Sequence, residues 1–141
     1  MTQNKLDISQ ASLAIKENRF AAALTYLKSN LKENPDHIDS LYLAAVSSRY
    51  LKKFDLSKEY LERLLIITPD MGRAYQELGH LNRDIGNNEN SITHYRQACE
   101  LNPALLASWK AIFNYFVEHN NQPAADPVSY THLTLPTSFE V

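Results

Sequence analysis

Three prolines, Pro35, Pro69 and Pro103, follow one another at intervals of 34 residues in this sequence. Each lies in a similar phrase, LKENPD, LIITPD or ELNPAL, so the interval belongs to a repeated unit. Each unit contains two helical patterns separated by a short turn. A repeat of this kind restricts the chain to helical hairpins that stack on their neighbours in chain order.

The repeat also places the ends of the helices. Its registers begin at Asn4, Ile38, Gly72 and Leu106. The turns inside the registers fall at Asn18, Lys52, Gly86 and Asn120. Asn and Gly tolerate the left-handed conformation that commonly ends a helix, but Lys52 is not a suitable residue for it. Each proline marks where a second helix stops, because proline has no amide donor and clashes inside a helix.

We therefore expect an all-α chain without a sheet before residue 127. The seven expected helices span 5–17, 20–33, 37–51, 54–67, 71–85, 88–101 and 105–119. At 141 residues, with 44% hydrophobic and 21% charged residues, the composition is that of one soluble globular domain.

The third register has the most regular pattern of large and small residues. Counted from Gly72 as position 1, its large residues at positions 4, 7 and 24 are Tyr75, Leu78 and Tyr95. Its small residues at positions 8, 20 and 27 are Gly79, Ser91 and Ala98, and position 32 is Pro103. This pattern resembles the tetratricopeptide repeat (TPR) family, although Asn82 replaces the aromatic residue usual at position 11. The small residues of the motif let two helices approach closely, while the large ones fill gaps between successive hairpins.

The other registers keep the motif less completely. The second keeps Leu41, Ala45, Ser57, Leu61 and Pro69, and the first keeps Ala11, Ala23, Leu27 and Pro35. Leu64 replaces a small residue at position 27 of the second repeat. In the first repeat, Asp7 and Asn30 are polar at normally buried positions, which suits an N-terminal capping repeat whose outer face meets water. The fourth repeat opens with Trp109, Ile112 and Phe116 but has the bulky Phe113 at position 8.

The chain ends in DPVSYTHLTLPTSFEV, from Asp126 to Val141, with the alternation of an edge strand. Residues 128–141 resemble the translation of a transposon-derived sequencing adapter, and they interrupt the fourth repeat at position 20. We therefore predict that 127–141 is a non-native, disordered tail and that the natural protein continues beyond Asp126. The alternative is a genuine C-terminal strand or linker.

The resemblance implies a right-handed superhelix of stacked helix-turn-helix repeats over residues 4–126. The expected repeats are 4–37, 38–71, 72–105 and an incomplete fourth repeat at 106–126. Their concave face is lined by positions 2, 5, 9 and 12 of each repeat. The residues expected to bind a partner there are Tyr42, Arg49, Arg73, Gln76, His80, Arg83, Lys110 and Asn114.

The charge of this face indicates the kind of partner. Its lining positions include five basic residues and one acidic residue, although the whole chain has a net charge of −2. An acidic or carboxylate-bearing peptide is therefore the expected ligand; alternatively, the cations only keep the face soluble. The two-carboxylate clamp that the family uses for chaperone tails is not expected, because Ile8, Ser12 and Leu43 stand at three of its positions.

No catalytic or metal-binding constellation is recognisable. The pairs His80 and Asp84, His94 and Cys99, and Glu59 and Glu62 form no ligand set or catalytic triad. Cys99 lies at an apolar helix position and is expected to be a buried, unreactive thiol. Gly72, Gly79 and Gly86 follow no strand and belong to no phosphate-binding loop. We therefore expect neither enzymatic activity nor a cofactor in this chain.

Partners and location follow from the same composition. A net charge of −2 argues against binding to nucleic acid or anionic membranes. The N-terminal MTQNKLDISQ lacks the apolar core of a signal peptide, and no run approaches a membrane span, so a cytoplasmic protein is expected. The expected partners are proteins or peptides, and the incomplete fourth repeat is expected to cause self-association.

Two hypotheses for function remain. The first is a scaffold that binds a partner segment in the concave groove. The second rests on residues 72–109, which resemble the repeat region of bacterial proteins in which a TPR array precedes a sulfotransferase domain. In that case the chain is the non-catalytic N-terminal region of a larger enzyme, and the reading frame beyond Asp126 would distinguish the two.

Overall fold

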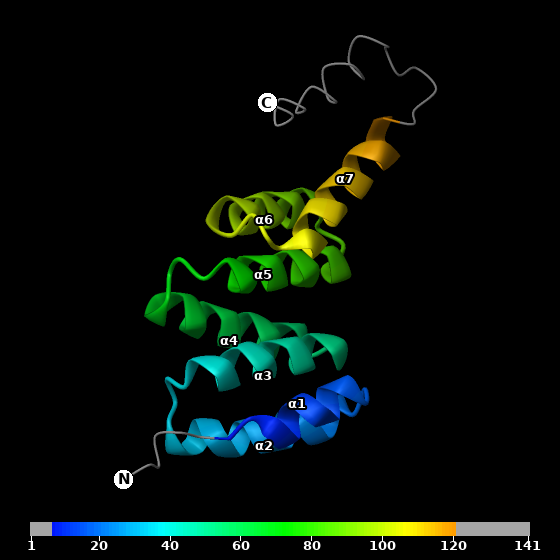
Figure 1. Cartoon of the computed structure of the whole chain (residues 1–141). Helices are drawn as coiled ribbons and strands as arrows, with labels where there is room; N and C mark the ends of the chain where they lie inside the picture. Colours follow the sequence, from blue (N-terminus) through cyan, green and yellow to red (C-terminus); the bar gives the residue numbers. More distant parts are fainter. Residues whose placement is uncertain (1–6, 121–141) are drawn as a thin grey trace.

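The computed structural model describes residues 7–120, which form seven helices and no strand (Figure 1). The helices are α1 (Ser9–Lys16), α2 (Phe20–Glu33), α3 (Ile38–Tyr50), α4 (Phe54–Ile67), α5 (Gly72–Ile85), α6 (Asn88–Leu101) and α7 (Leu106–Asn120). The all-α prediction is confirmed, and the helix ends agree with the predicted ones to within one residue, except that α1 begins four residues later. Both the predicted C-terminal tail and the second helix of the fourth repeat lie outside the described residues.

The helices pack as three hairpins, α1–α2, α3–α4 and α5–α6, which stack in chain order with α7 at the end (Figure 1). Each helix contacts its neighbours in the chain, and the first helices α1, α3, α5 and α7 also contact one another in sequence. The core runs between these layers and consists mainly of alanine and leucine. The result is the elongated, quasi-one-dimensional architecture of a helical repeat.

The turn inside each hairpin has the same geometry in all three cases. One residue adopts a positive φ, at Asn18 (62°), Lys52 (63°) and Gly86 (100°). The following amide then donates to the carbonyl five residues back. These bonds join Arg19 N to Ala14 O at 2.7 Å, Lys53 N to Ser48 O at 2.8 Å and Asn87 N to Asn82 O at 2.8 Å. This is the hydrogen bond of a Schellman motif, and it holds Lys52 in the left-handed conformation that its residue type does not favour.

The turns between hairpins confirm the predicted role of the prolines. Helices α2, α4 and α6 each end two residues before Pro35, Pro69 or Pro103. In two of these turns an asparagine side chain replaces the lost helical bond, because Asn34 Oδ1 accepts from Asp36 N and Asn102 Oδ1 accepts from Ala104 N, at 3.1 and 3.0 Å. The chain therefore reverses without leaving these amides unpaired.

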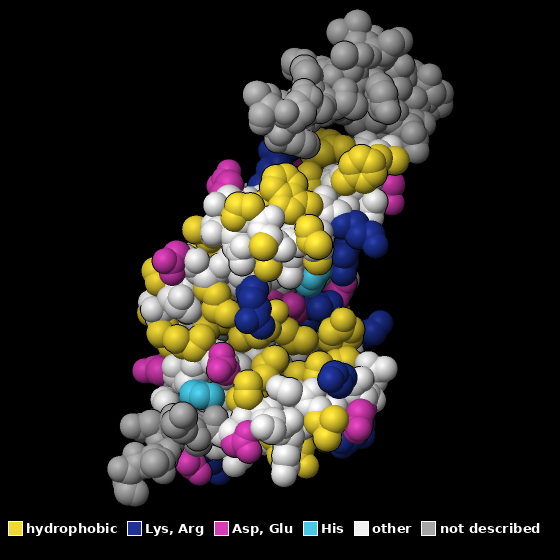
Figure 2. All heavy atoms as spheres, viewed as in Figure 1, with side chains coloured by type: hydrophobic (Ala, Val, Ile, Leu, Met, Phe, Trp, Pro, Cys, Tyr) yellow, Lys and Arg dark blue, Asp and Glu magenta, His cyan; other side chains and the backbone are white. Residues whose placement is uncertain are grey.

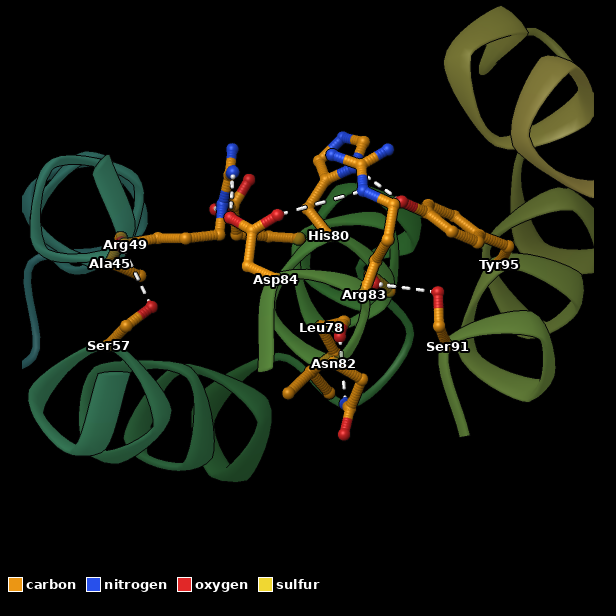
Figure 3. Close-up of polar contacts among 12 residues, drawn as sticks. Ala45, Arg49, Ser57, Leu78, His80, Asn82, Arg83, Asp84, Ser91 and Tyr95 are labelled. Carbon is orange, nitrogen blue, oxygen red and sulfur yellow. Dashed lines mark hydrogen bonds and ion pairs between the residues drawn. The ribbon is translucent and has the colours of Figure 1, made fainter. Parts of the chain in front are cut away.

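The small residues at positions 8 and 20 bring the two helices of a hairpin together, as predicted. Ser57 Oγ on α4 donates to Ala45 O on α3, and Ser91 Oγ on α6 donates to Gly79 O on α5, both at 2.9 Å (Figure 3). All four residues are buried. The sequence indicated the small size of these serines, but not that each hydroxyl would bond across the hairpin.

A difference in residue size distinguishes the second and third hairpins. Ala45 at position 8 is in the same hairpin as Leu61 at position 24, whereas Gly79 is paired with the larger Tyr95. A methyl group on Gly79 would lie 2.6 Å from the Tyr95 ring, which is closer than real contacts allow. The glycine is therefore required by the tyrosine, because both side chains occupy one fixed interhelical space.

The polar residues of the first repeat are hydrogen-bonded. Asn30 Nδ2 donates to the carbonyl of Asp7 and to Ser40 Oγ, both at 3.2 Å. Asp7 itself is exposed, and its Oδ1 accepts from Ser9 N at 2.8 Å. Asn30 thus stands at an ordinarily apolar position because it ties the segment before α1 to the start of α3.

Gly79→Ala should destabilise the chain by about 1–3 kcal/mol, because the new methyl group overlaps the Tyr95 ring. Urea unfolding followed by circular dichroism measures the loss. In a Tyr95→Leu background, which recreates the Ala45 and Leu61 combination of the second hairpin, the same substitution should cost less than half as much. Equal costs in the two backgrounds would show that the glycine is not required by the tyrosine.

Candidate functional site

The eight predicted groove residues lie on α3, α5 and α7, the first helices of three consecutive repeats. They are Tyr42 and Arg49 on α3, Arg73, Gln76, His80 and Arg83 on α5, and Lys110 and Asn114 on α7. Figure 2 shows side chains of both charges gathered over the middle of the stack. Contacts among these residues divide them into a buried polar network and a set of exposed side chains.

Arg49 is the centre of the buried network. Its guanidinium crosses from α3 to α5, where Nε donates to Glu77 Oε2 and Nη1 donates to Asp84 Oδ2 at 2.9 Å (Figure 3). The side chains of Arg49 and Glu77 are only 7% and 3% exposed. This pair joins two successive hairpins, so Arg49 is a structural residue rather than a free cation.

The two carboxylates change the predicted charge of the groove. Glu77 and Asp84 fall at positions 6 and 13 of the repeat, which the list of lining positions omits. Within residues 7–120, the lining positions hold four cations, Arg49, Arg73, Arg83 and Lys110, and one acid, Asp39. Adding Glu77 and Asp84 reduces the excess of positive charge there from three to one. The basic bias of the predicted groove is therefore weaker in residues 7–120 than the list of lining positions alone gives.

The pKa values in the network reflect its burial. Burial alone would lower the pKa of Arg49, but the carboxylates of Glu77 and Asp84 hold it above its ordinary value. Burial raises the pKa of Glu77, and the guanidinium of Arg49 opposes this shift. At neutral pH we take Glu77 to be ionised, because its carboxylate accepts a charge-assisted hydrogen bond from Arg49.

His80 lies beside this network and is bonded to the core. Its Nδ1 and the Tyr95 hydroxyl share a hydrogen bond of 2.6 Å, and the two rings meet edge to face at 5.3 Å (Figure 3). Burial lowers the pKa of His80 to about 4, and the positive charges of Arg49 and Arg83 add to the effect. His80 is thus neutral at physiological pH and adds no charge to the groove.

Three exposed cations remain along the groove. The Arg73 guanidinium lies 4.3 Å from the centroid of the Tyr42 ring, a cation–π contact between α5 and α3. Arg83 is half exposed, with its Nε 3.7 Å from Asp84 Oδ1. Lys110 on α7 is exposed. These side chains keep N–H groups available to solvent or to a ligand.

Gln76 and Asn114 complete the predicted set. Gln76 Oε1 accepts a 2.7 Å hydrogen bond from Ser108 Oγ, which joins α5 to α7 through a fully buried serine. Asn114 is exposed and lines a partly open cavity of about 210 Å³ between α5, α6 and α7. Prominent lining residues of the cavity are Arg83, Ser91, Tyr95, Asn114, Tyr115 and Glu118. This cavity joins two predicted groove residues and offers hydroxyl, amide and charged groups to a ligand.

Residues 7–120 were also compared with the requirements of a metal site, a reactive thiol and a membrane-spanning helix. They contain no group of three or more His, Cys, Asp or Glu side chains that could hold a metal ion. Cys99 is buried, as predicted, and burial raises the pKa of its thiol, which makes it a poor nucleophile. Among the described helices, none has both the length and the apolar character to cross a membrane.

Arg49→Met should destabilise the chain by about 3–5 kcal/mol at pH 7, because it leaves the buried Glu77 carboxylate without its partner. Adding Glu77→Leu should recover most of the loss, since the unpaired charge is then removed. Urea midpoints of the single and double variants measure both effects. A single variant within about 0.5 kcal/mol of the wild type would contradict a structural role for Arg49.

His80 should make stability depend on pH. Its pKa is about 4 in the folded chain against an ordinary value of 6.5, so between these values the unfolded chain binds a proton that the folded chain does not. Its stabilising contribution is therefore complete above pH 6.5 and is lost as the pH falls through 4. The urea midpoint of the wild type should fall more steeply over this range than that of His80→Gln. Parallel pH profiles for the two proteins would refute the assignment.

Comparison with known proteins identifies the repeat. Residues 72–105, which contain α5 and α6, match the tetratricopeptide repeat family. No curated protein matches the sequence of the chain. The Sgt2 TPR domain from Aspergillus fumigatus has a similar structure, with a TM-score of 0.72 and 19% identity over 89% of this chain and 85% of that domain.

Two further structures have the same architecture. The first TPR of Spaghetti (RPAP3), bound to the HSP90 peptide SRMEEVD, gives a TM-score of 0.68 at 15% identity over 75% of this chain and 84% of that one. The O-GlcNAc transferase of Thermobaculum terrenum gives 0.74 at 22% identity over 92% of this chain but only 24% of the transferase. At these identities the likeness shows the fold alone: the chain has the all-α superhelical fold of tetratricopeptide-repeat domains, and residues 72–105 match one repeat of that family.

Proposed function

We propose that this chain is an interaction scaffold that binds an extended segment of a partner protein along the groove of α3, α5 and α7. The observation that carries the proposal is the set of exposed polar side chains on α5 and α7, which ends at the open cavity beside Asn114. These side chains are Arg73, Arg83, Lys110 and Asn114. The Spaghetti domain supports it, because a domain of the same fold holds a short peptide. Equivalent residues on the first helices of successive repeats lie side by side at a regular spacing, so an extended segment can contact them one after another.

The exposed cations favour a segment with acidic residues. Arg73 and Arg83 on α5 and Lys110 on α7 present N–H donors, whereas Arg49 already has two carboxylate partners. Because His80 is neutral, these three cations dominate the exposed charge of the groove. A carboxylate of the partner that reaches Arg83 would make a charge-assisted hydrogen bond at the mouth of the cavity.

A second candidate places the same array inside a larger enzyme. The Thermobaculum terrenum transferase supports it in general form, because this chain corresponds to only 24% of that protein. A downstream sulfotransferase domain, a bacterial source and a cytoplasmic location stay predictions from the sequence. In either setting the array acts by binding, and the catalytic groups would lie outside residues 7–120.

Peptides selected on the full chain from a random library of 12-residue segments test the groove. We expect acidic peptides, and Arg73→Glu with Arg83→Glu should weaken their binding by about tenfold or more, while helicity is unchanged. Arg49 is avoided because it is buried, and its replacement would leave the buried Glu77 carboxylate without a partner. The matched control is Lys28→Glu with Lys58→Glu on α2 and α4, which changes the net charge equally and should leave affinity intact.

Two results would contradict this proposal. Equal weakening by the groove variant and the control variant would show that only net charge matters. Selected peptides whose affinity does not change with the Arg73 and Arg83 substitutions would place binding outside the groove. Affinity for acidic peptides should also fall as the salt concentration rises, because exposed charges are screened.

A further inference from the structure

Apart from the proposed groove, an exposed apolar surface lies on α7, on the side turned away from α5 and α6. Its stripe consists of Leu106, Trp109, Phe113 and Val117, which are 76%, 46%, 67% and 40% exposed. At about 100° per residue, these four side chains fall within roughly 80° of the helix circumference. Ala111 and Tyr115, on the opposite side, are partly buried against the cavity. An α-helix that is apolar on two opposite sides is typically covered on both.

The earlier hairpins show what covers this side. The equivalent residues of α3 at positions 4 and 8, Leu41 and Ala45, are completely buried because α4 packs on them. On α5, Gly79 is buried beneath α6 in the same way. No helix of residues 7–120 performs this role for α7, although Trp109 and Phe113 stand at the same two positions. The natural shape of an occupant is therefore a helix antiparallel to α7.

Positive charges border the stripe on both sides. Lys110 follows Trp109 along the helix and is exposed. On the other border, the Arg96 guanidinium of α6 lies 5.5 Å from the centroid of the Phe116 ring. Neither cation forms an ion pair with the residues that the structure describes, and Glu118, the only carboxylate of α7, lines the cavity instead. A helix that complements this surface would have acidic residues on both borders of its apolar face.

We propose that this stripe docks one amphipathic helix of a partner protein, with acidic residues flanking its apolar face. Phe113 stands where the earlier hairpins have Ala45 and Gly79, so the docked helix needs small residues opposite it. The earlier hairpins show the same dependence: the larger Tyr95 is paired with Gly79, and the smaller Leu61 is paired with Ala45. The surface goes beyond the proposed groove, from which it differs in both its chemistry and the form of its ligand.

Two synthetic helices of 14 residues, the length of α4 and α6, test the proposal on the full chain. They share an apolar face of alanine and leucine but are flanked by glutamate in one and lysine in the other. Trp109 is the only tryptophan of the sequence, so its fluorescence reports on the stripe alone. The acidic helix should shift its emission to the blue, protect it from acrylamide and bind at least about tenfold more tightly than the basic helix.

Charge reversal gives the sharpest variant. Arg96→Glu with Lys110→Glu should invert the preference so that the basic helix binds more tightly, a result that mere unfolding cannot produce. Phe113→Glu should abolish binding of both helices. Its matched control, Ile66→Glu, replaces an 82% exposed isoleucine of α4 and should change nothing. The groove variant Arg73→Glu with Arg83→Glu should also keep the preference for the acidic helix.

Four results would overturn the proposal. One is absence of binding by either helix, and another is equal binding by both. A third is a wild-type dimer in sedimentation that Phe113→Glu dissociates, since the occupant would then be a second copy of the chain. The fourth is a monomer in which Trp109 already resists acrylamide, since the chain would then cover the stripe itself.

Discussion

The close approach of two helices at positions 8 and 20 of each repeat is the contact on which the architecture depends. Small side chains there leave room for the hydroxyls of Ser57 and Ser91 to reach carbonyls of the facing helix. In the second and third hairpins that bond joins the two helices where they cross, and the residue at position 24 fills the space that remains. The first hairpin has Ala11 and Ala23 at these positions and makes the same close approach without a hydroxyl. Because each hairpin rests on the preceding one, the same contact also sets the spacing of the first helices that form the groove.

The residues of the proposed groove are held in place by residues of the core. Tyr95 packs over Gly79 inside the third hairpin, and its hydroxyl reaches His80 at the groove floor. Arg49 likewise stabilises the stack rather than being available to a ligand, because its guanidinium on α3 is bonded to Glu77 and Asp84 on α5. The groups of the proposed groove that are available to a ligand are the exposed cations and the amide of Asn114. The hydrogen-bonded network beneath them holds the helices in position.

The repeat could be predicted from sequence because each of its signals is local. Prolines, turn residues and small residues act on neighbours at fixed sequence distances, and so six of the seven helices are placed to within one residue. The repeat also predicted the turn at Lys52, but the residue type did not indicate its positive φ. The hydrogen bond from Lys53 N to Ser48 O imposes that conformation. The position list of the groove treats each helix alone, so it found Arg49 but not the carboxylates that reach it from the next hairpin.

The two candidate surfaces meet on α7. One side of this helix supplies Lys110 and Asn114 to the proposed groove, and the adjacent side carries the stripe of Trp109 and Phe113, with Lys110 at the border between them. Among the described helices, α7 packs only against α5 and α6, whereas α3 and α5 also pack against a following helix. A helix seated on the stripe would hold α7 from both sides and reduce the conformational freedom lost when a segment binds in the groove.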